Sequence, residues 1–238
     1  MKRSSSAFWW EDLKAAHGSI VVVLLWWGVN SWLSSLAADA NALYWTFGLS
    51  REGFFSGKWW ALLSYAGLHG SWIHALLNGL AMVFLGARVE RIGGVKWLAG
   101  LFVFGTLAGG VLHLAFESER ILVGGSGGIM AMLLFLTGVS AQARLRFLPL
   151  SGKNFGRGIL LGSLFLMVTR PDLGWPVLSG MGEWIQRISF ESVYAVSHAC
   201  HAGGAIAGLA WARWTLRPRM SLQQIRRARE KNEQRAQR

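Results

Sequence analysis

Six long apolar blocks dominate the sequence and constrain its fold more than any other feature. An α-helix needs about 20 largely apolar residues to cross the roughly 30 Å hydrocarbon core of a bilayer, and most of the blocks approach that length. Hydrophobic residues make up 53% of the chain and charged residues only 15%, below the roughly 25% charged residues typical of soluble domains. We therefore predict an all-α membrane protein, a bundle of six transmembrane helices. The blocks are Ser19–Leu36, Trp72–Ala87, Trp97–Phe116, Gly127–Ala143, Phe155–Val168 and Tyr194–Leu216.

The blocks divide the chain into three expected parts. These are an amphipathic N-terminal segment (1–18), the six-helix membrane domain (19–216) and a basic tail (217–238). Two long connections, 37–71 and 169–193, are rich in aromatic residues and are expected to lie at the membrane interface, which Trp and Tyr favour.

Short basic connections are expected on the other side of the membrane, at 88–96 and 144–154.

Ala38-Asp39-Ala40 resembles a signal-peptide cleavage site. The apolar run before it is longer than usual for a signal peptide, so an uncleaved span is favoured.

The positive charges are distributed asymmetrically about the blocks. With the N-terminus inside, all but five of the 24 Lys and Arg residues fall on the inner side. This bias follows the positive-inside rule and predicts a multi-pass protein with both termini cytoplasmic, in a bacterial inner (plasma) membrane. Nucleic-acid binding by the tail is an alternative reading of the net charge of +12. A helix near anionic lipid is favoured instead, and no nucleic-acid partner is expected.

Polar residues lie near the outer ends of three blocks. His74 and Asn78 are four residues apart and share one helix face, Ser126 directly precedes the fourth block, and His201 lies in the sixth. Measured from basic landmarks at the inner ends, at about 1.5 Å per residue, the three levels agree within about one helical turn. We therefore expect one polar layer just below the outer surface.

These residue types predict acyl-transfer chemistry. A serine hydroxyl with an imidazole in reach is a nucleophile with its general base. Free N–H groups at a helix N-terminus, with His74 and Asn78, are suited to stabilise an oxyanion. No acidic residue occurs in the second, fourth or sixth block, so the sequence predicts a Ser–His dyad rather than a triad.

Glycines surround Ser126 in the stretch VGGSGG, residues 123–128. Gly124 and Gly125 permit a tight path into the membrane, and Gly127 permits close approach of a neighbouring helix. A four-residue glycine spacing also favours ordinary helix packing, and it recurs at Gly105/Gly109, Gly158/Gly162 and Gly204/Gly208.

Other readings of the histidines remain open. His74 and His201 on facing helices would suit axial ligation of a haem. Zinc would need three or four good ligands, and the HExxH pattern is absent. Neither a metal ion nor another cofactor is expected. Cys200 is adjacent to His201 and points away from it on a helix, so it is expected to pack as a small apolar side chain.

With these residues in view, the chain resembles the rhomboid family of intramembrane serine proteases. The resemblance covers roughly residues 19–216, and three motifs in order carry it. They are HxxxxHxxxN (His69, His74, Asn78), GxSG (Gly124, Ser126, Gly127) and HxxGxxxG (His201, Gly204, Gly208). Three features depart from the family pattern. Trp59-Trp60 stands where the family has Trp-Arg, Met130 where an aromatic residue is common, and His198 is an additional histidine.

The resemblance implies a function and roles for the site residues. Ser126 would be the nucleophile and His201 the base, while His74, Asn78 and the Ser126 N–H would form the oxyanion hole. The partners would be the lipid bilayer and transmembrane protein substrates cut near the outer face. A monomer would suffice for catalysis, and the oligomeric state stays open. The alternative is an inactive rhomboid-like protein that binds membrane helices for folding or quality control, although such proteins normally lose the serine or the histidine.

Overall fold

The computed structural model describes residues 16–36, 40–117, 120–144, 149–189 and 193–217, with Lys14, Arg226, Arg227, Arg229 and Glu233. Most of the predicted N-terminal segment 1–18 and of the tail 217–238 lies outside the described residues. So does most of the Ala38-Asp39-Ala40 stretch.

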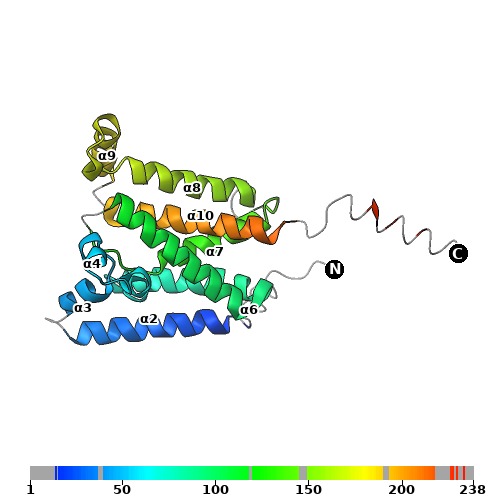
Figure 1. Cartoon of the computed structure of the whole chain (residues 1–238), viewed down its shortest axis with the longest axis horizontal. Helices are drawn as coiled ribbons and strands as arrows, with labels where there is room; N and C mark the ends of the chain where they lie inside the picture. The colour runs from blue at the N-terminus through cyan, green and yellow to red at the C-terminus, as the bar shows by residue number, and fades with distance from the viewer. Residues whose placement is uncertain are drawn as a thin grey trace.

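Long helices packed side by side form the body of the protein (Figure 1). In the described ranges no strand occurs, and β-type backbone pairing consists of two isolated bridges, Leu49–Leu122 and Arg144–Ser151. Among the residues that the structure describes, two helices are long and apolar enough to cross a membrane by length and composition, α2 and α6. The long helices are α2 (His17–Ser35), α6 (Trp72–Phe116), α7 (Ser126–Val139), α8 (Gly152–Val168) and α10 (His198–Thr215).

The helix α6 is a hairpin of two helices that meet at Gly94. Gly94 has φ 73° and ψ −177°, in the left-handed region that glycine enters without a steric penalty. A Cβ on Gly86 would lie 3.0 Å from Leu98 Cδ1, whereas residues twelve apart in a straight helix are separated by about 18 Å. The prediction of a loop at 88–96 is therefore wrong, because the chain reverses at a single glycine and stays helical on both sides.

The two long connections are folded into short helices rather than extended loops. Several block boundaries also differ from the prediction. The helix α7 ends at Val139, not Ala143, α8 begins at Gly152, not Phe155, and α10 begins at His198, not Tyr194. The Ser197 hydroxyl accepts a hydrogen bond from Cys200 N and so sets the start of α10. The short helices are α3 (Ala40–Phe47), α4 (Arg51–Phe55), α5 (Ala61–Ser64), η2 (Tyr65–Gly67), η3 (Pro171–Leu173), α9 (Pro176–Ile188) and η4 (Val193–Ala195).

The first long connection is anchored without a Trp-Arg pair. Trp60 Nε1 donates to Thr46 O at 3.0 Å, and Lys58 Nζ donates to Trp45 O at 3.1 Å. Both bonds reach carbonyl groups near the end of α3. The residues around Trp59-Trp60 therefore tie α3 to α5.

The helix α9 turns an apolar stripe away from the bundle. Its buried residues Ser179 and Gly182 face the end of α8, where a Cβ on Gly182 would collide with Thr169 O. The opposite face is apolar and exposed. This pattern is typical of a helix that lies in a membrane interface. The exposed stripe consists of Val177, Met181, Trp184 and Ile188.

Glycines allow the central helices α6, α7 and α10 to touch. A Cβ on Gly204 would lie 2.1 Å from Gly127 O, and one on Gly208 would lie 2.1 Å from Ala131 O. A Cβ on Gly105 would lie 2.8 Å from Gly127 O. These separations are well below van der Waals contact, so the backbones approach closely here and no larger residue fits.

The glycine pair of α8 is different, and it supplies a matched control. A Cβ on Gly158 would have nothing within 4 Å. We expect Gly204→Ala to lower the free energy of unfolding by about 1–3 kcal/mol, because the new methyl group forces α10 away from α7. Gly158→Ala should leave it unchanged or raise it by up to about 1 kcal/mol, since alanine is the better helix former. Thermal unfolding in detergent, followed by circular dichroism, measures both; equal shifts would contradict the close packing of α7 and α10.

Candidate active site

Ser126 is the first residue of α7, and backbone hydrogen bonds hold the segment that precedes it in place. Leu122 N and O both pair with Leu49, at 2.8 and 3.0 Å, and Gly124 N donates to Tyr65 O at 2.9 Å. Gly124 has φ +112°, a conformation that glycine adopts readily and other residues rarely do. The irregular backbone before Ser126 is thus packed against protein, which is the condition for such backbone inside a bilayer.

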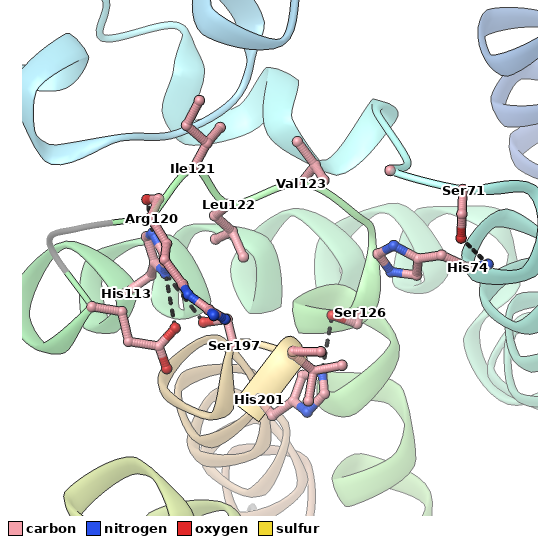
Figure 2. A pocket seen from close by; sticks show the side chains of 14 residues that line it. Ser71, His74, His113, Arg120, Ile121, Leu122, Val123, Ser126, Ser197 and His201 are labelled. Atoms are coloured by element: carbon pink, nitrogen blue, oxygen red, sulfur yellow. Dashed lines mark hydrogen bonds and ion pairs between the residues drawn. The ribbon is translucent and has the colours of Figure 1, made fainter. Parts of the chain in front are cut away.

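His201 lies in the first turns of α10 and faces Ser126. Its Nε2 atom is 3.0 Å from Ser126 Oγ, and Figure 2 shows the two side chains pointing toward each other. This distance is within the reach that a nucleophile and its base require. The contact of Gly204 with the Gly127 carbonyl brings α10 and α7 close enough for it.

His74 and Asn78 lie beside the segment that leads to Ser126. A Cβ on Gly124 would be 2.7 Å from His74 Nε2 and 3.6 Å from Asn78 Nδ2. Asn78 is buried, and within the described residues its Nδ2 has no hydrogen-bond partner. Buried donors almost always have a hydrogen-bond partner. A buried Nδ2 donor without one, close to the segment that leads to Ser126, is suited to donate a hydrogen bond to an oxyanion.

A cavity of about 300 Å³ opens beside Ser126, His74 and His201. Figure 2 shows the 120–123 segment along one side and His113 and Ser197 at the far end. The cavity therefore leaves open space next to the Ser126 hydroxyl. Its lining is Gly70, Ser71, His74, His113, Glu117, Arg120, Ile121, Leu122, Val123, Ser126, Ala195, Val196, Ser197 and His201.

His69, the first residue of the HxxxxHxxxN motif, lies next to this centre. The His69 ring packs edge-on against His74, with centroids 5.0 Å apart, and against Trp26 at 4.9 Å. His69 Nδ1 is 3.4 Å from Asn30 Nδ2, so His69 lies behind His74. Met130 is on α7, four residues after Ser126, and is partly buried.

His198 and Cys200 are engaged elsewhere. His198 Nε2 is 2.8 Å from Val193 O, and its ring centroid is 6.1 Å from that of His201. Cys200 is buried, with its sulfur 3.6 Å from Tyr65 Oη. Cys200 therefore packs as a small side chain, as predicted.

Sequence reasoning missed a buried charged group at the far end of the cavity. His113 is 1% exposed, and its Nδ1 is 3.3 Å from Glu117 Oε2. Burial would raise the pKa of Glu117, but hydrogen bonds from His113 and Ala199 N and the nearby Arg170 guanidinium lower the pKa to about 2. The four-residue spacing of His113 and Glu117 was the available signal.

Comparison with known proteins agrees with this architecture. The Rhomboid domain matches residues 56–218, more than half of the chain. RHOMBOID-like protein 2 of Arabidopsis thaliana is 33% identical over 169 residues, which cover 60% of this chain and 51% of that protein. Rhomboid protease GlpG of Klebsiella pneumoniae is 29% identical over 154 residues, covering 64% and 47%. RHOMBOID-like protein 4 of Arabidopsis thaliana is 30% identical over 143 residues, covering 49% and 36%.

The chain spans about a third to a half of the length of these relatives. The predicted family is confirmed by the domain match, and the apolar helices agree with the integral membrane character of that family. The chain belongs to the rhomboid family.

Proposed function

We propose that this protein is an intramembrane serine endopeptidase that cleaves transmembrane substrates near the outer face of the membrane. The observation that carries the proposal is the 3.0 Å separation of Ser126 Oγ and His201 Nε2 in the wall of a cavity. Both groups come from one chain, so a monomer is sufficient for catalysis.

In the proposed reaction, Ser126 Oγ attacks the carbonyl carbon of the scissile peptide bond while His201 Nε2 takes the hydroxyl proton. The carbonyl oxygen becomes an oxyanion, which accepts hydrogen bonds from the Ser126 N–H, Asn78 Nδ2 and the His74 ring. His201 then gives its proton to the leaving amine as the carbon–nitrogen bond breaks. A water molecule from the cavity, deprotonated by His201, hydrolyses the acyl-enzyme and restores Ser126.

The proposal includes a topology. The six spans would be α2, the two halves of α6 on either side of Gly94, α7, α8 and α10, in a membrane domain of residues 19–216. Figure 1 supports this arrangement, because α3, α4 and α9 gather at one end of the bundle, while α2 begins and α10 ends at the other. The distribution of Lys and Arg supports cytoplasmic termini, and a bacterial inner membrane stays a prediction from sequence.

A fluorophosphonate reagent tests the proposal directly. It should label the detergent-purified wild type and leave Ser126→Ala unlabelled, because only an activated serine attacks phosphorus readily. Absence of labelling in a folded wild type would favour the non-proteolytic alternative, a rhomboid-like protein that binds membrane helices. A Soret band in purified material would favour the haem alternative.

Loss of either side-chain donor of the oxyanion hole should lower kcat more than it changes KM. We expect Asn78→Ala to reduce kcat by about 10²–10³-fold, and His74→Ala to act in the same direction. Asn30→Ala is the matched control, since Asn30 is also a buried amide but bonds to Trp26 O and His69. It should lower stability without a comparable loss of kcat. Steady-state cleavage of a transmembrane test substrate measures the difference, and equal losses in the two asparagine variants would count against the assigned role.

A further inference from the structure

A buried carboxylate joins the end of α6 to the start of α10. Glu117 directly follows α6 and is 1% exposed. Its Oε1 accepts a hydrogen bond from Ala199 N at 3.0 Å. Ala199 is the second residue of α10, so its N–H has no partner within the helix. Glu117 therefore caps α10 from a distant part of the chain.

The second cap of α10 is connected to the same carboxylate. Ser197 Oγ accepts from Cys200 N at 3.1 Å. His113 Nδ1 lies 3.1 Å from Ser197 Oγ and 3.3 Å from Glu117 Oε2. Two of the free N–H groups at the start of α10 are thus held by one network, and that network is anchored on the end of α6.

A guanidinium from the end of α8 completes the network. Arg170 Nη1 is 3.4 Å from Glu117 Oε2, and Arg170 is 3% exposed. Its other nitrogens make paired hydrogen bonds to Asp172, at 2.9 and 2.8 Å. Bidentate pairs of this kind fix the geometry of both partners. Glu117 is consequently held between three helices, α6, α8 and α10.

We infer that Glu117 is a positioning residue, which fixes the first turn of α10 so that His201 stays within hydrogen-bond distance of Ser126. The inference rests on the proposed function. His201 is two residues beyond Ala199, so a shift of the first turn moves its ring directly. In the described residues no hydrogen bond or ion pair joins Glu117 to Ser126 or His201, so Glu117 acts through the helix. A misplacement of about 1 Å can cost about 10²-fold in rate.

Two substitutions of Glu117 separate its contributions. Glu117→Gln keeps an oxygen that can accept from Ala199 N but removes the charge, whereas Glu117→Leu removes both. We expect kcat to fall by about tenfold for Glu117→Gln and by about 10²-fold for Glu117→Leu, with KM within about twofold of wild type. Partial rescue by glutamine is the sign that hydrogen bonding to the helix matters. If Glu117→Leu fails to fold, Glu117→Gln alone decides the question.

Glu90 provides a matched control. It is also a buried carboxylate that caps a helix, since it accepts hydrogen bonds from Gly18 N and Ser19 N of α2, each at 2.9 Å. Glu90→Gln should lower the melting temperature in detergent while kcat per folded molecule stays at the wild-type value. The comparison therefore subtracts the general effect of losing a buried charge.

The experiment measures kcat, KM and melting temperature for both glutamine variants in the same preparation as the wild type. Equal kcat in Glu117→Gln and Glu90→Gln at similar loss of stability would overturn the inference. So would a raised KM with unchanged kcat, which would indicate a role in substrate binding. If the wild type itself neither cleaves the substrate nor shows Ser126-dependent labelling, the proposed function fails, and the inference fails with it.

Discussion

Ser126→Ala is expected to abolish cleavage of a transmembrane test substrate while the fold is retained. The reaction needs the hydroxyl oxygen itself, and losing the nucleophile of a serine protease costs a factor on the order of 10⁴ or more in kcat. The structural cost is small, because the substitution removes one oxygen beside a cavity and breaks one hydrogen bond, to His201. We expect the free energy of unfolding to change by no more than about 1.5 kcal/mol.

The measurement is cleavage in proteoliposomes, with circular dichroism and melting temperature as the check on folding. Cysteine at the same position is a useful companion, since it keeps a nucleophile of similar size. Unchanged cleavage by Ser126→Ala would refute the assigned nucleophile. Loss of activity together with loss of helicity would call for the Ser126→Cys variant to decide between chemistry and folding.

The two histidines of α10 should differ sharply. His201→Ala is expected to reduce kcat by a factor on the order of 10⁴ or more, because no other base lies within hydrogen-bond distance of Ser126 Oγ in the described structure. His198→Ala should stay within about tenfold of wild type, since removing one hydrogen bond costs about 1 kcal/mol. His198 Nε2 is already bonded to Val193 O.

The two substitutions form a natural pair, because both remove an imidazole from the same turn of the same helix. Cleavage rates and fluorophosphonate labelling rates of the two variants compare them directly. Similar activity in both would mean that the base has been assigned wrongly. A larger loss in His198→Ala would exchange the roles of the two residues.

The sequence was most informative where chemistry and spacing acted together. Ser126, His74 and His201 were expected in one layer from their distance to basic landmarks, and all three line one cavity in the structure. Apolar length likewise located the start of α6 at Trp72, as predicted, and the end of α10 at Thr215, one residue from the predicted Leu216. Such features depend on composition over many residues, so small local effects do not disturb them.

Features decided by single residues or by distant partners were not predictable. The hairpin at Gly94 depends on one backbone conformation, and the basic residues around it favoured a longer loop. The role of Glu117 depends on Arg170 and Ala199, which are far away in the sequence. The short helices between 40 and 67 have too few turns to show a helical period. In each case tertiary contacts, rather than local pattern, determine the outcome.

Mapping the site of fluorophosphonate attachment is the most direct test of the central claim, that Ser126 and His201 form an accessible catalytic pair. The wild-type protein is labelled in detergent, digested and analysed by mass spectrometry. A single adduct on Ser126, with labelling at least about 10²-fold slower in His201→Ala, is the predicted result. An adduct on another residue, or equal labelling rates with and without His201, would contradict it.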